Sequence, residues 1–356
     1  MPFDPNSLAQ KDSNIFGLPF TEQEAQIVII PVPWEVTVSY NAGTAAGPDA
    51  IFEASSQVDL YDPVLADAWR IGVHMQKKDE VIQQLNDEMR PKAEEYIAML
   101  EDGRSPEEDA HMRVLLGEIN EACATMNHKV QSRAEALLKA QKIPCLVGGD
   151  HSTPLGLMRA LRAKHPTFSI LHIDAHADLR DAYEGFEYSH ASIMFNALKE
   201  KHIDRIVQVG IRDYCQAEKE LIDSSNGRVV TYFDRDLKSL VFDGKSFKQV
   251  CGEIVSHLSP DVYISFDIDG LDPRFCPNTG TPVPGGLDFD QVLYLFEQVV
   301  ESGRRIIAFD LNEVAPGKES EWDANVGARA IYRLANLLAK SNGLAGLDLD
   351  LSLIHI

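Results

Sequence analysis

The feature that most constrains the fold of this chain is a regular alternation of short apolar runs and longer amphipathic segments from residue 143 onward. The apolar runs have the length and composition of buried strands, and the longer segments carry apolar residues at helical spacing. We expect strands at 143–147, 168–173, 205–209, 228–232, 262–267 and 305–310. We expect helices at 153–164, 191–200, 246–258, 287–302 and 324–341. This alternation predicts an α/β fold, in which a parallel sheet has helices on both faces.

The N-terminal part of the chain is less regular. Residues 26–30 are a further strand candidate. Residues 75–111 are strongly charged, and we interpret them as a solvated helical insertion, with a subunit contact as the alternative role. A polar connection near 103–106 separates two helices, of which the second covers 112–139 and has apolar residues at three- and four-residue spacing. We interpret the whole chain, residues 1–356, as one domain that carries this insertion.

Composition limits the possible partners and compartment. The net charge is −22, so we expect no binding to nucleic acid, which needs a basic face. For the same reason we expect no binding to an anionic membrane surface. The acidic surface slightly favours a cationic substrate. Five widely spaced cysteines without a C-x-x-C pair favour a reducing compartment. Residues 1–20 lack a signal peptide and no apolar run approaches about 18 residues, so we expect a cytoplasmic protein. The apolar tail 349–356 either packs at an edge of the fold or is foreign to the native chain.

Three of the expected strands are followed by loops rich in possible metal ligands, at residues 148–152, 174–178 and 267–273. In open parallel sheets, sites form outside the carboxyl ends of the strands, so we expect these loops to meet. In the second loop the acidic and histidine side chains occupy every second position, and in an extended backbone they would project to one side. Asp267 and Asp269 repeat this spacing. His172 shares it too, but lies inside the strand, so we interpret it as a core or supporting histidine.

The candidate ligands are four carboxylates and two imidazoles: His151, Asp174, His176, Asp178, Asp267 and Asp269. Burying such a cluster without a cation is costly. Two divalent cations would balance the four carboxylates, whereas one would leave two of them uncompensated. Carboxylate-rich ligands with few histidines and no cysteine favour Mn²⁺, with Ni²⁺, Co²⁺ or Fe²⁺ as alternatives. Zn²⁺ more often brings additional His or Cys ligands.

The motifs G-G-D-H-S, D-A-H-A-D and S-F-D-I-D-G-L-D-P, in this order, resemble those of the ureohydrolase family of arginases and agmatinases. The resemblance extends to T-G-T-P with a following G-G, and to D-L-N-E-V-A-P at 310–316, and it covers about residues 26–341. It implies an arginase-like fold of three α/β/α layers around a mostly parallel eight-stranded sheet. It also implies a binuclear manganese centre.

The resemblance divides the six ligands between two metals, with His151 and Asp178 on one, His176 and Asp269 on the other, and Asp174 and Asp267 bridging both. In this family a hydroxide that bridges the metals attacks the guanidinium carbon, and urea and an amine are released, so Asp174 counts among the catalytic groups as well. The chemistry explains the need for metals, because a guanidinium is a poor electrophile and neutral water is a poor nucleophile.

Four further residues are predicted to act on the substrate. His190 matches the family histidine assigned to proton shuttling, and Glu313 matches the carboxylate that grips the guanidinium by paired charge-assisted contacts. A surface or capping histidine and a structural ion pair are the alternatives for these two. Thr37, in the aromatic-rich loop 34–40, and Trp322 are expected to line a small pocket, where an indole would offer cation–π contacts. Simple packing is the alternative for the tryptophan.

The loop at 179–190 bears on the choice of substrate. It is acidic, lacks the Asn/Thr/Ser-rich pattern with which arginases hold the amino-acid head group, and is more similar to agmatinase-type sequences. We therefore predict hydrolysis of agmatine to putrescine and urea. Guanidine or another small guanidino compound, with nickel, is the alternative, and arginine and formimidoylglutamate are less favoured. A different hypothesis is that the chain is a non-catalytic ureohydrolase-like subunit. Such proteins usually lack some of the metal ligands, whereas all six are present here. The resemblance also implies a homo-oligomer, either a trimer or a hexamer.

Overall fold

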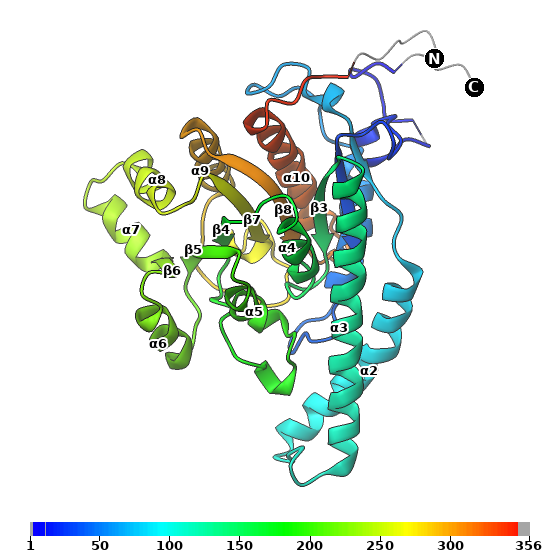
Figure 1. Cartoon of the computed structure of the whole chain (residues 1–356), viewed down its shortest axis with the longest axis vertical. Helices are drawn as coiled ribbons and strands as arrows, with labels where there is room; N and C mark the ends of the chain where they lie inside the picture. The colour runs from blue at the N-terminus through cyan, green and yellow to red at the C-terminus, as the bar shows by residue number, and fades with distance from the viewer. Residues whose placement is uncertain (1–2, 11, 348–356) are drawn as a thin grey trace.

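A computed structural model describes residues 3–10 and 12–347 of the chain, so the tail at 349–356 lies outside the described residues. In the described part, eight strands form one parallel sheet in the order β2-β1-β3-β8-β7-β4-β5-β6 (Figure 1). The predicted parallel α/β class is confirmed. The strands are β1 Ile27–Val32, β2 Val73–Met75, β3 Ile143–Gly148, β4 Phe168–Ile173, β5 Ile203–Ile211, β6 Val229–Phe233, β7 Asp261–Asp267 and β8 Arg305–Asn312.

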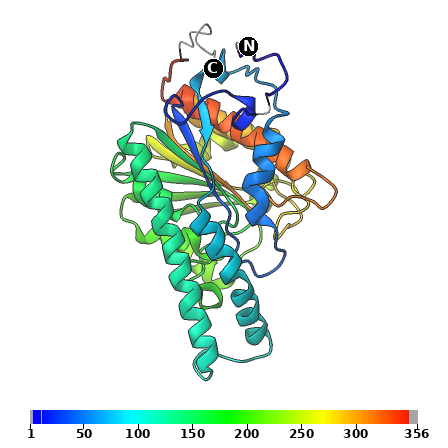
Figure 2. The same cartoon turned by 90° about the vertical axis from the view of Figure 1, so that its right-hand side faces the viewer.

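Helices cover both faces of the sheet. One face carries α3, α4 and α5, and the other carries α1, α8, α9 and α10, which gives the three predicted layers (Figures 1 and 2). No helix of the described residues is long and apolar enough to cross a membrane. The helices are α1 Gly47–Ser55, α2 Glu80–Glu101, α3 Ala110–Lys139, α4 Leu155–Leu161, α5 Ile193–Lys199, α6 Gln216–Ser224, α7 Asp234–Phe242, α8 Phe247–Ser256, α9 Phe289–Glu301 and α10 Trp322–Ser341.

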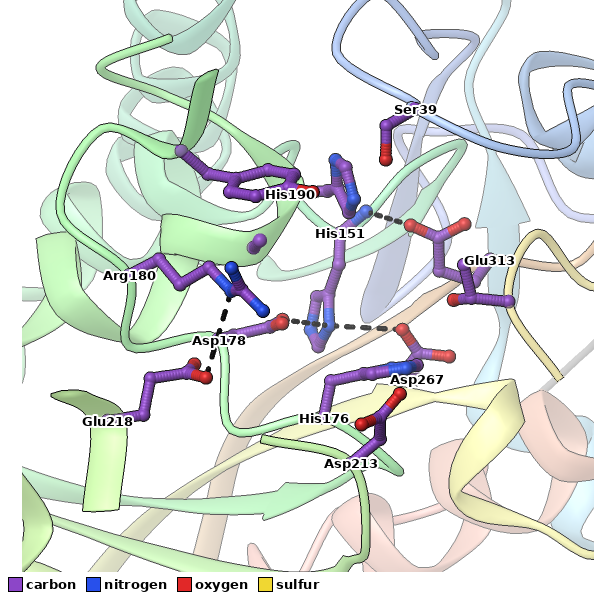
Figure 3. A pocket seen from close by; sticks show the side chains of 13 residues that line it. Ser39, His151, His176, Asp178, Arg180, His190, Asp213, Glu218, Asp267 and Glu313 are labelled. Atoms are coloured by element: carbon purple, nitrogen blue, oxygen red, sulfur yellow. Dashed lines mark hydrogen bonds and ion pairs between the residues drawn. The ribbon is translucent and has the colours of Figure 1, made fainter. Parts of the chain in front are cut away.

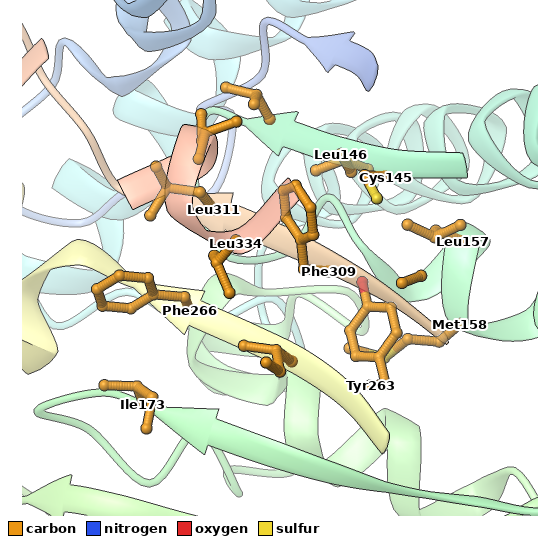
Figure 4. Close-up of a cluster of buried hydrophobic side chains, with 14 of the residues drawn as sticks. Cys145, Leu146, Leu157, Met158, Ile173, Tyr263, Phe266, Phe309, Leu311 and Leu334 are labelled. Carbon is orange, nitrogen blue, oxygen red and sulfur yellow. The ribbon is translucent and has the colours of Figure 1, made fainter. Parts of the chain in front are cut away.

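The core explains why the candidate ligands lie beyond the strands rather than within them. The central strands β3, β8, β7 and β4 are buried almost throughout, because helices pack on both faces. Figure 4 shows side chains from these strands packed with residues of α4 and α10, among them the buried rings of Tyr263, Phe266 and Phe309. With few exceptions the strands are therefore apolar, and charged groups collect where the strands end.

The charged segment before β3 forms two long helices, as predicted. They are α2 and α3, joined at residues 102–109 (Figure 2). Together they make a hairpin whose far end extends beyond the sheet (Figures 1 and 2). We call it the α2–α3 hairpin. Its interpretation as an insertion into the domain stays a prediction.

Candidate active site

The six predicted ligands come together at the carboxyl edge of the sheet. His151 follows β3, Asp174, His176 and Asp178 follow β4, and Asp267 ends β7 with Asp269 just beyond it. These strands, with β8 between β3 and β7, are contiguous in the sheet. Parallel strands present their carboxyl ends at one edge, and the ligands of three loops therefore meet there.

His151 is the centre of the first group of ligands. Its Nδ1 lies 3.0 Å from Asp174 Oδ2. It also lies 3.2 Å from Asp178 Oδ2 and 3.3 Å from Asp267 Oδ2 (Figure 3). Burial alone would lower the pKa of this imidazole, but the contacts with Asp174 and the other two carboxylates raise the pKa of His151 well above its usual value. Three carboxylates on one ring nitrogen require a positive charge at this point.

The far side of the His151 ring determines which positive charge fits. The hydroxyl of Ser265 donates to Asp310 Oδ1 at 3.1 Å, and the same oxygen lies 2.9 Å from His151 Nε2. Since the hydroxyl proton is used on Asp310, His151 Nε2–H donates to Ser265. A neutral His151 therefore turns its Nδ1 lone pair toward the three carboxylates, the orientation a metal ligand needs. The donor set fits a divalent ion.

The second group of ligands consists of Asp174, His176 and Asp269. His176 Nδ1 lies 3.1 Å from Asp269 Oδ2 and 3.5 Å from Asp174 Oδ1. The buried Oδ2 of Asp269 accepts no hydrogen bond from the described residues, so a cation is a fitting partner for it. Asp174 contributes to both groups, as a bridging ligand would. Asp267 belongs to neither set of converging atoms; its Oδ2 lies near His151 Nδ1, and its Oδ1 accepts a hydrogen bond from Asp269 N.

His172 also lies within reach of the first group, but its hydrogen bonds favour the supporting role predicted for it. Thr231 donates to Gln208 Oε1, and the amide of Gln208 donates to Ala177 O and to His172 Nδ1 at 3.1 Å. With Nδ1 accepting, His172 Nε2–H must donate to Asp174 Oδ2 at 2.8 Å. Burial lowers the pKa of His172, which keeps the ring neutral.

Beyond the strand ends, the ligand loops keep an extended, strand-like backbone only in part. β4 ends at Ile173, and Asp269 lies in a short 3₁₀ helix, Ile268–Gly270. Asp267 Oδ1 begins this turn by accepting a hydrogen bond from Asp269 N. Asp178 has a positive φ of 55°, which turns its carboxylate back toward His151. Asp178 and Asp269 therefore reach the cluster through turns, whereas His176 still forms a parallel β-bridge with Asp213.

A cavity of about 170 Å³ opens over the ligand cluster (Figure 3). Glu313, one residue beyond β8, projects into it, and its Oε1 accepts a hydrogen bond from His151 N at 2.8 Å. Burial, together with the charge of Asp150, raises the pKa of Glu313 well above its usual value. A cationic substrate group beside Glu313 would relieve this penalty.

His190 forms another part of the cavity wall and is fixed by Thr37. His190 N donates to Thr37 Oγ1 at 3.1 Å, and His190 Nδ1 lies 3.3 Å from the same oxygen. Thr37 donates its only proton to Asp150 Oδ2, so His190 Nδ1–H donates to Thr37 and the Nε2 lone pair is left available. Burial lowers the pKa of His190 to about 4.

The other two predicted substrate contacts do not lie on the cavity wall. Thr37 is fully buried and meets the cavity only through His190. Trp322 is 45% exposed at the start of α10, and its indole N–H donates to Arg274 O at 2.9 Å. Trp34, in the aromatic-rich loop, is buried in the core.

The structure adds cavity residues that the sequence did not single out, among them Ser39, Arg180, Tyr183, Asp213 and Glu218. Arg180 Nε lies 3.8 Å from Glu218 Oε2, and its guanidinium stands 4.6 Å from the centre of the Tyr183 ring. Arg180 and Tyr183 lie in the loop at 179–190, which is expected to select the substrate, so their position in this loop could have identified them from the sequence. Glu218 comes from α6, an element that was not predicted.

With this geometry established, comparison with known proteins gives the family. The family model described as "Arginase family" matches residues 25–336. The chain belongs to the arginase family. Its arginase-family relatives include the N(1)-aminopropylagmatine ureohydrolase of Thermus thermophilus, 29% identical over 332 residues that cover 92% of this chain and 95% of the relative. They also include the agmatinase of Cronobacter sakazakii, 31% identical over 350 residues, or 95% and 97% of the two chains.

The solved structures agree with the fold. The agmatine ureohydrolase of Thermoplasma volcanium superposes with a TM-score of 0.69 over 93% of this chain and 96% of that chain, at 23% identity. The predicted recognition and fold are thus confirmed, and the chain is an agmatinase-like enzyme of the ureohydrolase class. Membership of the arginase family implies divalent metal ions, for which the cluster around His151 is a possible site. The individual ligand assignments stay predictions.

Proposed function

We propose that this enzyme hydrolyses a small guanidino compound to urea and an amine, using two divalent metal ions, with Mn²⁺ favoured and Ni²⁺ as the alternative. The observation that carries the proposal is the position of Glu313. Its carboxylate shares one small cavity with the ligand cluster, next to His151. A planar guanidinium bound by Glu313 in paired contacts would have its carbon over the cluster.

The residues of the chain have separate tasks in this reaction. Glu313 binds and orients the guanidinium, and its own orientation is held by the His151 backbone N–H. Divalent ions, when bound by the six ligands, supply Lewis acidity and lower the pKa of water toward neutrality. Addition of water to the guanidinium carbon and cleavage of its C–N bond release an amine, which must leave protonated. We assign this proton transfer to His190 Nε2, because the other ring nitrogen of His190 is hydrogen-bonded to Thr37.

Agmatine is our first candidate substrate. Relatives of this chain bear the names agmatinase and N(1)-aminopropylagmatine ureohydrolase. Asp213 and Glu218 place carboxylates in the cavity wall, where the second cation of agmatine would find a counter-charge. The cavity of about 170 Å³ suits a small substrate.

A second candidate is a guanidino compound with a carboxylate, such as 4-guanidinobutanoate. The sequence shows no carboxylate clamp, but the structure places Arg180 in the cavity wall. Its contact with Glu218 is long, at 3.8 Å, so guanidinium N–H groups are left to bind an anion. Guanidine itself, which has no tail, would use neither Arg180 nor the wall carboxylates.

Urea release should be measured with agmatine, N(1)-aminopropylagmatine, 4-guanidinobutanoate, guanidine and arginine, each with Mn²⁺ and with Ni²⁺. We expect the highest kcat/KM with agmatine. Preference for 4-guanidinobutanoate would move the assignment to the second candidate, and preference for arginine would contradict both. No urea from any of these compounds would overturn the proposed reaction.

The site assignment is tested by Asp267→Ala. We expect this variant to lose metal-dependent urea release and part of its bound metal, because a carboxylate beside His151 is removed. Asp272→Ala is the matched control, since Asp272 lies in the same loop and its side chain accepts one hydrogen bond within the described residues, from Arg274 N. Full turnover by Asp267→Ala with unchanged metal stoichiometry would falsify the site assignment.

We also propose that the enzyme assembles as a homo-oligomer, a trimer or a hexamer, because the family resemblance implies it. Light scattering on the purified chain measures the mass of the particle directly. A monomeric mass at the concentrations used for the activity measurement would overturn this part of the proposal.

A further inference from the structure

Two loops form the cavity wall opposite the metal ligands. The first substrate loop, residues 33–43, follows β1 and carries Ser39 into the cavity. The second substrate loop, residues 179–192, follows the ligands of β4 and carries Arg180 and His190 into it. The two loops meet where Thr37 binds His190, so their relative position determines where the imidazole stands.

The first substrate loop is held from outside by α2. Arg90 donates through one guanidinium nitrogen to the carbonyl oxygens of Glu35, Val36 and Val38. Asn86, on the same helix, accepts a hydrogen bond from Glu35 N at 2.8 Å. Loop backbone without these partners would leave buried polar groups unsatisfied, because Val36 and Val38 are themselves buried.

The second substrate loop is held by the same hairpin, through both of its helices. Asn120 of α3 donates to Gly185 O at 3.1 Å, and accepts from Glu187 N at 2.9 Å. The ring of Tyr96, on α2, packs 5.4 Å from the ring of Phe186. Gly185 has a φ of 85°, and a Cβ there would lie 3.1 Å from the Tyr96 hydroxyl, so the loop and the helix are in close contact.

We propose that the α2–α3 hairpin is a clamp that holds the two substrate loops in register, with Arg90 and Asn120 as positioning residues for His190. This role differs from the solvated insertion or subunit contact expected from its charge pattern. The inference rests on the proposed function for its kinetic consequence, since a proton-transfer group misplaced by about 1 Å can cost on the order of 100-fold in rate. Its structural part, the ordering of the loops, does not need that function.

The first test is Arg90→Met, which keeps the aliphatic stem and removes the donors to the loop carbonyls. We expect amide hydrogen exchange at Val38 and His190 to quicken by about tenfold or more, and kcat to fall by about tenfold or more with metal content unchanged. Arg90→Lys should recover part of both losses. Lys92→Met is the matched control. It changes a charged residue of the same helix, but Lys92 forms an ion pair within the hairpin, with Glu118 at 2.6 Å.

The second test approaches the clamp from the other loop and avoids dependence on one variant. Asn120→Leu removes both hydrogen bonds to the second substrate loop, and we expect faster exchange at Glu187 and His190 with a smaller kcat. If Arg90→Met and Asn120→Leu both match Lys92→Met in exchange and in kcat, the clamp is overturned. Exchange is measured without substrate, so an enzyme inactive on every guanidino compound would sink the proposed function and leave this test intact.

Discussion

Two residues of the candidate site hold backbone conformations that L-amino acids avoid. Asp178 and Glu313 have φ values of 55° and 63°. Each such residue costs on the order of 1 kcal/mol or more, and strain of this kind collects at functional sites. At Glu313 the backbone is tied on both sides, because its N–H donates to Gly149 O and its carbonyl accepts from Thr279. The strain therefore directs a carboxylate into the cavity.

Glu313→Gln tests this carboxylate with little change in shape. The Gln Oε1 can still accept from His151 N, so we expect normal folding and metal content. The charge for the guanidinium is lost, and we expect kcat/KM to fall by about 100-fold, which corresponds to about 2.7 kcal/mol. Steady-state urea release and metal analysis of the same sample measure both. Wild-type kcat/KM in this variant would remove Glu313 from the substrate site.

At this scale the sequence predicts some residues of the site and not others. The ligands were predictable because each stands at the end of an apolar strand or within five positions beyond it. Arg180 and Glu218 were not, because nothing in the local pattern says that α6 brings Glu218 beside the loop after β4. Trp322 was predicted to line the pocket because an indole can make cation–π contacts, but its indole N–H donates to Arg274 O instead.

At the scale of elements, the α2–α3 hairpin owes its existence to local signals. Each helix begins after an aspartate whose side chain accepts hydrogen bonds from the first turn, Asp79 for α2 and Asp109 for α3. The polar connection near 103–106 and the helical spacing of apolar residues in 112–139 made the two helices predictable, and the caps add a local signal of the same kind. Their contacts with the substrate loops were not predictable, since Arg90 and Glu35 are far apart in sequence.

Asp79→Ala should destabilise the protein by about 1 kcal/mol, the usual value of an N-cap. Burial would raise the pKa of Asp79, but the bond from Ile82 N and the charge of Lys129 outweigh it, and the pKa is lowered below 3.8. Because the pKa of Asp79 is lower in the folded state, its ionised carboxylate contributes fully to the free energy of unfolding above pH 3.8. This contribution is lost as the pH falls through the folded-state pKa.

Urea denaturation of wild type and Asp79→Ala at pH 7 and toward pH 3 measures this contribution. We expect the difference in unfolding free energy to shrink at the acid end. Asp102→Ala, at the other end of α2, is the control, with an expected effect within about 0.5 kcal/mol. A difference that stays constant with pH would show that the carboxylate charge of Asp79 is not the source.

Elements missed from the sequence share a physical cause. β2 has three residues and pairs only with β1 at the edge of the sheet, too short for any periodicity to appear. The helices α6 and α7 have nine residues each and bury few of them. Short helices with so few buried residues are fixed mainly by packing against the finished sheet.

At the scale of the whole molecule, acidic charge is concentrated where metal is expected. The chain carries −22, and this charge includes the buried carboxylates of the site, which repel one another. Burial and the charge of Asp174 raise the pKa of Asp178 to about 7. Burial, with Asp269 and Asp174, also raises the pKa of Asp267 well above its usual value. Such shifts mark a negative potential that the protein atoms leave uncompensated.

Removal of metal should therefore destabilise the entire fold, because the ligands belong to three adjacent loops on the central strands. We expect chelation to lower Tm and Mn²⁺ to restore it. The free energy of unfolding should rise by RT ln(1 + [Mn²⁺]/Kd), which is about 2.7 kcal/mol at 100 times Kd. Calorimetry of the full chain after chelation and during Mn²⁺ titration measures this. Asp174→Asn, which removes the carboxylate common to both ligand groups, should show little response to Mn²⁺. An equal Tm with and without metal in the wild type would mean that the cluster is stable by its own hydrogen bonds, and that no cation compensates its charge.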